Sequence, residues 1–133
     1  MVVILSQIFI MKDITNREDI ELMVNTFYDV VRNDKRLSFL FDETAKVDWP
    51  HHLPKMYDFW ESVLFDKALF SGNPMGAHIK LHNTETLKSE DFDIWIRLFN
   101  ANIDKHFSGP ITEKAKQRAE SIATITKIKT VYS

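Results

Sequence analysis

The chain has 133 residues and a formal net charge of −2, with 44% hydrophobic and 27% charged residues. These proportions are ordinary for a single globular domain, and the small charge argues against nucleic acid or a membrane as a partner. The sequence contains no cysteine. Disulfides, thiolate metal sites and iron–sulfur clusters are therefore excluded, and any metal must be held by His, carboxylate, Met or Tyr.

Residues 1–10 are strongly apolar but lack the basic start and cleavage site of a signal peptide, and they are too short to span a bilayer. We expect an extra segment from a mis-assigned start codon, or else a segment that packs on the core or on a neighbouring chain. The expected single domain covers residues 11–133, and the expected location is the cytoplasm.

The first predicted helix begins near residues 15–18, where Thr15 and Glu18 have the spacing of a capping box. Apolar residues then recur at three- and four-residue steps as far as Val31, which is one helical face. Asn33-Asp34 ends this helix. Residues 37–47 are expected to form a connector with a turn or two of helix.

Asp48-Trp49-Pro50 is typical of a helix start, with an acidic N-cap and a proline in the first turn. The glycines and proline of residues 66–77 indicate a loop, and a brief helical turn is plausible over residues 77–81. A third helix opens at Ser89, Gly109-Pro110 ends it, and a last helix starts at about Ile111. Because no credible hairpin signal interrupts these helices, an all-α fold is expected.

The five histidines include two pairs. On a helix, His52 shares a face with Met56 and Phe59 and is expected to point inward, whereas His51 points to water. A packed histidine with one hydrogen bond is the commoner outcome for such a residue. His78 and His82 lie four residues apart, which can form a metal site, but the glutamate of a zincin helix is missing. On spacing alone, a packed histidine also remains the better interpretation of His78.

Two aromatic residues carry polar groups on apolar helix faces. A buried Tyr28 needs a partner for its hydroxyl, most often a backbone carbonyl and sometimes a bound ligand. A tryptophan such as Trp95 is usually a core residue and occasionally an indole donor that lines a cavity. The carboxylates sit mostly on polar faces, and a solvated surface is expected for them.

Four stretches together carry a specific resemblance. They are Phe27-Tyr28-Asp29-Val30-Val31-Arg32, His52 with Phe59-Trp60, Asn73-Pro74-Met75-Gly76-Ala77-His78 and Phe92-Asp93-Ile94-Trp95-Ile96-Arg97-Leu98-Phe99. In order and spacing they resemble the third group of the truncated haemoglobins, over residues 13–130. The resemblance implies a two-over-two helical sandwich around haem b.

The same resemblance implies roles for individual residues. His78 corresponds to the proximal iron ligand, and Tyr28, His52 and Trp95 to the distal ligand-binding residues. The implied haem-pocket residues are Phe27, Met56, Phe59, Trp60 and Met75. The propionate partners cannot be read from the sequence, and Lys80 is one candidate.

Three functions remain open from the sequence. The first is a haem globin that binds O2, NO or CO. The second is a haem enzyme for NO dioxygenation or peroxide removal, with a reductase as a candidate partner. Distal hydrogen-bond donors can stabilise the charge that develops during such a reaction. The third is a non-haem helical interaction domain. A monomer or weak dimer is expected.

Overall fold

The structure is a computed structural model, which describes residues 11–69, 81–82 and 86–132. Its elements in chain order are α2 (Arg17–Asn33), α3 (Lys35–Ser38), the π-helix η1 (Phe39–Thr44), α4 (Trp49–Phe65), α6 (Ser89–His106) and α7 (Pro110–Thr130). Within those ranges the fold is all-helical, as predicted. None of the described helices has the length and hydropathy needed to cross a membrane.

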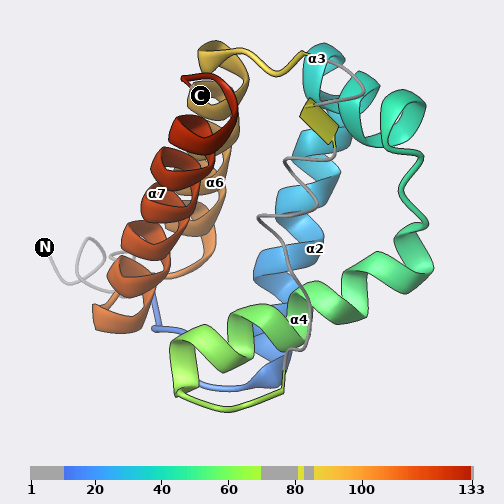
Figure 1. Cartoon of the computed structure of the whole chain (residues 1–133). Helices are drawn as coiled ribbons and strands as arrows, with labels where there is room; N and C mark the ends of the chain where they lie inside the picture. The colour runs from blue at the N-terminus through green and yellow to red at the C-terminus, as the bar shows by residue number, and fades with distance from the viewer. Residues whose placement is uncertain (1–10, 70–80, 83–85, 133) are drawn as a thin grey trace, which may run out of the picture.

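The helices form two packed pairs, α2 with α4 and α6 with α7, and α2 also packs against α6. Figure 1 shows α6 and α7 side by side and α4 passing the foot of α2. Buried apolar residues from all four helices form one core cluster. This arrangement is the predicted two-over-two sandwich.

Helix α2 begins one residue later than the capping-box pattern suggested. The N-cap is Asn16, whose side chain accepts a hydrogen bond from the backbone N–H of Asp19 at 2.9 Å. Thr15 instead donates its own N–H and hydroxyl to the Asp19 carboxylate. The predicted apolar face is confirmed, because its members are buried: Ile20, Met23, Val24, Phe27, Tyr28 and Val31.

The connector after α2 is helical, as expected, but part of it is a π-helix. The Asp34 carboxylate caps α3 by accepting from the backbone N–H groups of Arg36 and Leu37, each at 3.0 Å. Leu37 and Leu40 enter the core from this segment. Phe41 also lies in η1. Its ring contacts Tyr28 of α2 and Trp49 of α4.

Helix α4 starts after the predicted N-cap Asp48, with Pro50 in its first turn. Its C-cap is Asp66, which adopts the left-handed conformation with φ of 54°. The expectation that carboxylates face solvent is wrong for Glu61 in this helix, which is buried. Its charge is balanced because Arg17 and Lys67 each donate to it at 2.9 Å.

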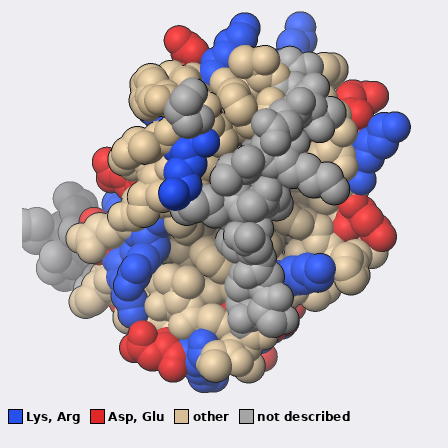
Figure 2. Space-filling view, in the orientation of Figure 1, with Lys and Arg blue, Asp and Glu red and all other residues tan. Residues whose placement is uncertain are grey.

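Helices α6 and α7 are joined by a tight turn at Gly109. Small residues at four-residue steps, Ala115, Ala119 and Ala123, are buried on α7 and allow a close approach to α6. On the face drawn in Figure 2, basic and acidic side chains are interspersed around the edge, with no large patch of one sign among the described atoms.

Candidate haem pocket

Tyr28 stands at the centre of a cluster of aromatic rings from three elements. Its ring centroid lies 5.2 Å from that of Trp49, 5.4 Å from that of His52 and 5.9 Å from that of Phe41. Helix α2 supplies the tyrosine, η1 supplies Phe41, and the first turn of α4 supplies Trp49 and His52. We call these four residues the distal cluster.

The hydroxyl of Tyr28 is buried, since the residue is only 8% exposed. Burial raises the pKa of this phenol, so the hydroxyl stays protonated and remains a hydrogen-bond donor at neutral pH. Among the described residues its polar neighbour is Nε2 of His52, at 3.4 Å. The common alternative, a hydrogen bond to a backbone carbonyl, is not made within that part of the chain.

His52 is half-buried beside this hydroxyl, whereas His51 is exposed, as the helical periodicity predicted. Burial lowers the pKa of His52, and the positive charges of Lys55 and His51 lower it further. The imidazole is therefore neutral at pH 7. When Nε2 carries the proton it can donate to the tyrosine oxygen, which leaves the tyrosine O–H directed elsewhere.

Three residues that surround this pair were not predicted to belong to the site: Arg32, Asp42 and Trp49. The indole N–H of Trp49 donates to Oδ1 of Asp42 at 2.8 Å. The Arg32 guanidinium lies 4.8 Å from the Trp49 ring centroid and its Nε lies 3.7 Å from Oδ2 of Asp42. Trp49 precedes His52 by three residues, so helical spacing offered a signal for that contact. The contacts to Asp42 and Arg32 join separate elements, and no spacing rule indicates them.

A second group of rings connects the distal cluster to the core. Trp95 packs edge-on against Phe27 at 5.6 Å and is stacked with Phe99 at 5.8 Å. Trp60 is also stacked with Phe99, and their ring centroids are 5.1 Å apart. Phe59 packs edge-on against Trp60. Phe27 and Trp60 are buried, while Phe59, Met56 and Trp95 are partly exposed and pack against the core.

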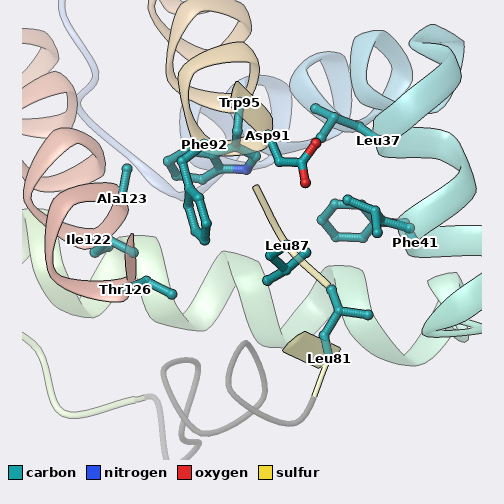
Figure 3. Close-up of a pocket in the computed structure, with 11 residues that line it drawn as sticks. Leu37, Phe41, Leu81, Leu87, Asp91, Phe92, Trp95, Ile122, Ala123 and Thr126 are labelled. Carbon is teal, nitrogen blue, oxygen red and sulfur yellow. The ribbon is translucent and has the colours of Figure 1, made fainter. Parts of the chain in front are cut away.

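Beside these rings lies a pocket that holds about 490 Å³ of space between atoms, part of it open to solvent. Figure 3 shows walls from α3 and η1, α6 and α7, with Leu81 and Leu87 below. The lining is almost entirely apolar: Leu37, Leu40, Phe41, Leu81, Leu87, Asp91, Phe92, Trp95, Ile122, Ala123 and Thr126.

The pocket and the distal cluster share a wall. Phe41 belongs to both, and Trp95 lines the pocket while packing on Phe27, the neighbour of Tyr28 on α2. The other described residues predicted for the site are not among the residues that line the pocket: Phe27, Tyr28, His52, Met56, Phe59 and Trp60. Figure 3 shows the Phe41 and Trp95 rings facing the same space.

Two polar groups in the lining were not foreseen. The buried carboxylate of Asp91 accepts two hydrogen bonds from Arg36, at 2.9 and 3.1 Å, and one from the backbone N–H of Lys88. This bidentate pair ties α3 to the start of α6 and neutralises the charge at the pocket wall. The hydroxyl of Thr126 is buried and has no hydrogen-bond partner in the structure as described.

The predicted proximal ligand His78, together with Met75 and Lys80, lies outside the described residues. Its rival His82 is described and half-buried. Nδ1 of His82 accepts a hydrogen bond from the backbone N–H of Leu87 at 3.1 Å. This bond joins Leu87 to His82, and Leu87 and the neighbour of His82, Leu81, both line the pocket.

The described part of this site fits a haem group. A flat apolar macrocycle needs apolar walls, which the pocket provides, and Trp95 brings an indole N–H to that wall. The buried Tyr28, a second donor, contacts the Phe41 ring of the lining. The unpaired Thr126 hydroxyl is a further polar group for which a pocket occupant would supply a partner.

Comparisons with known proteins agree with this geometry. No family model matches the chain. The chain is 30% identical over 112 residues to "Group 3 truncated hemoglobin ctb" of Campylobacter jejuni, covering 82% of this chain and 86% of that protein. It is also similar to the crystal structure of a group III truncated hemoglobin from Campylobacter jejuni, with a TM-score of 0.78 and 27% identity. That match covers 90% of this chain and 95% of the other.

The identity, the coverage and the two-over-two helical arrangement lead to the same assignment, which the four sequence stretches had predicted. The chain belongs to the group 3 truncated haemoglobins, a family of haem-binding globins.

Proposed function

We propose that the protein binds O2 and other diatomic ligands, NO and CO among them, on a haem b held in the pocket beside Trp95, with His78 as the iron ligand. The observation that carries this proposal is the Tyr28 hydroxyl, which is buried, protonated and uncommitted to any backbone carbonyl among the described residues. Haem iron supplies the atom to which a diatomic ligand attaches.

The chain's own residues would stabilise such a ligand through hydrogen bonds. The Tyr28 O–H donates to a ligand that carries partial negative charge, and neutral His52 donates from Nε2 to the tyrosine oxygen, which strengthens the first bond. The indole N–H of Trp95 is a second donor at the pocket wall. The surrounding apolar rings exclude water and so lower the local dielectric constant.

A pocket with several donors holds O2 tightly, because a hydrogen bond to a charged acceptor contributes about 1.5–3 kcal/mol. Tight binding argues against simple oxygen delivery. A haem enzyme for NO dioxygenation or peroxide removal, working with a reductase, is the second candidate, because the distal donors could also stabilise charge during O–O cleavage. Membership of a haem-binding family disfavours the non-haem interaction domain.

The test is reconstitution of the purified protein with haem, followed by absorbance spectroscopy. We expect a Soret band and a spectrum typical of a proximal imidazole in the native chain. His78→Ala should lose or greatly weaken haem binding, with His51→Ala as the matched control, because His51 is exposed. Absence of a Soret band would eliminate both haem functions, and a normal imidazole spectrum in His78→Ala would move the ligand to another residue such as His82.

A further inference from the structure

The strongest unassigned feature is the group formed by Arg32, Asp42 and Trp49, which we call the Trp49 clamp. Its three residues come from α2, η1 and α4. These are the elements that also supply Tyr28, Phe41 and His52. The clamp therefore joins, at one point, the segments that carry the distal cluster.

The indole of Trp49 is restrained on several sides. Its N–H is fixed by the Asp42 carboxylate at 2.8 Å. Its ring is stacked with Phe41 at 5.8 Å and 26°, and the Arg32 guanidinium lies over the ring at 4.8 Å. A half-buried tryptophan held by a charge-assisted hydrogen bond and two ring contacts has little rotational freedom.

His52, in contrast, is held weakly. The contact to the Tyr28 hydroxyl is 3.4 Å, which is long for a hydrogen bond. The remaining restraint in the described structure is ring packing. The imidazole lies edge-on to Trp49 at 5.6 Å and 84°, and edge-on to Tyr28 at 5.4 Å and 78°. Because His52 sits near the exposed start of α4, loss of one ring wall would let it turn toward water.

We propose that Trp49 is a positioning residue for the distal pair, and that the Trp49 clamp keeps His52 beside the Tyr28 hydroxyl and thereby slows ligand release. The clamp touches neither the ligand nor the pocket lining except through Phe41. It acts by fixing where the His52 imidazole lies. This inference rests on the proposed function of the same site.

Two variants remove the clamp in different ways. Asp42→Ala removes the acceptor of the indole N–H, and Trp49→Phe keeps an aromatic ring but removes that N–H. Both should accelerate O2 release about three- to tenfold. A change of this size corresponds to the usual interaction free energy between neighbouring residues of one hydrogen-bond network. Asp42→Asn retains an oxygen acceptor but loses the ion pair with Arg32, and it should largely restore the native rate. Glu43→Ala is the matched control, because Glu43 is an exposed acid in the same π-helix.

A second measurement separates positioning from general loosening of the fold. In the ferrous protein saturated with carbon monoxide, NMR titration should give His52 a pKa below the ordinary value of 6.5, because the imidazole is partly buried. In Asp42→Ala and Trp49→Phe this pKa should rise toward that value as the imidazole reaches water. Asp42→Asn and Glu43→Ala should keep the native value.

A double-mutant cycle completes the test. If the clamp works through the distal pair, Asp42→Ala should change the release rate little once Tyr28→Phe is present. Additive effects of the two substitutions, or a native His52 pKa in Asp42→Ala, would overturn the proposal. Failure of the proposed function gives a different result, namely no haem spectrum at all, and an NMR titration of His52 in the haem-free protein then still tests the position of the imidazole.

Discussion

The Tyr28 hydroxyl is buried, and within the described structure its hydrogen-bond partner is His52, at a long distance of 3.4 Å. Tyr28→Phe removes this donor and keeps the ring that packs on Phe27, Phe41 and Trp49. We expect O2 to dissociate roughly ten to a hundred times faster, the equivalent of one hydrogen bond to a charged acceptor. Flash photolysis or stopped-flow displacement by carbon monoxide measures the rate.

An unchanged rate in Tyr28→Phe would transfer the dominant hydrogen bond to Trp95 or His52. Tyr57→Phe is a suitable control, because Tyr57 is also an aromatic residue with a hydroxyl, and its partner is the exposed Asn25 on the outside of the fold. It should leave the release rate unaltered.

Sequence alone predicted the placement of single residues where helical periodicity decides it. The inward position of His52, the outward position of His51 and the burial of Tyr28 all follow from spacing on a helix face. The Trp49 clamp and the Asp91–Arg36 pair could not be predicted, because their members are brought together by packing between separate elements. His78 and Met75, inferred from the family resemblance, remain predictions.

At the scale of elements, the start of α7 depends on a residue almost one hundred positions earlier. The Asp13 carboxylate accepts hydrogen bonds from the backbone N–H groups of Ile111 and Thr112, at 2.8 and 2.9 Å, and from the Thr112 hydroxyl at 2.7 Å. Gly109 has φ of +145°, and a Cβ there would lie 2.5 Å from the Asp13 side chain. Only glycine at this position permits the cap.

Asp13→Ala should therefore destabilise the protein by about 1–2 kcal/mol at pH 7, the usual cost of losing an N-cap. Denaturant unfolding measures the difference, and Asp29→Ala, an exposed acid on α2, is the control. An Asp13→Ala variant as stable as the native chain would show that water replaces the carboxylate at no cost.

The Asp13 cap should also make the free energy of unfolding depend on pH. Burial acts to raise the pKa of Asp13, but the hydrogen bonds from Ile111, Thr112 and Ile14 outweigh it and hold the pKa below 3.8. A carboxyl with a lowered folded-state pKa stabilises the fold fully above its unfolded value and loses this contribution as pH falls through the folded value. The difference in the free energy of unfolding between the native chain and Asp13→Ala should thus be constant above about pH 4 and become smaller below it.

Element boundaries were predicted well where caps and breakers are local, as at Asp48-Trp49-Pro50 and Gly109-Pro110. The start of α2 was placed wrongly by one residue, because Thr15 and Asn16 are both good caps and the geometry of Asp19 decides between them. The π-helix had no sequence signal. The burial of Glu61 depends on Arg17 from α2 and Lys67 beyond α4, which periodicity within one helix cannot reveal.

At the scale of the whole molecule, the pocket lies between the connector after α2 and the α6–α7 pair. Its walls come from α3 and η1, which follow α2, and from α6 and α7. A group that fills this pocket replaces open space with contacts to α3 and η1 on one side and to α6 and α7 on the other. Binding should therefore be coupled to the stability of the entire fold and not to one helix alone.

Haem binding should consequently raise the thermal midpoint of unfolding. A ligand at 1,000 times its Kd stabilises the native state by about 4 kcal/mol, which for a chain of this size corresponds to about 10–15 °C. Circular dichroism of the haem-free and reconstituted protein measures the shift. Metal-free protoporphyrin is the matched control, because it fills the same apolar walls but has no iron for a histidine to bind. Porphyrin should therefore give a smaller shift than haem, and the difference reports the contribution of the iron–histidine bond. Equal midpoints with and without haem would contradict haem binding in a pocket that joins the connector to the α6–α7 pair.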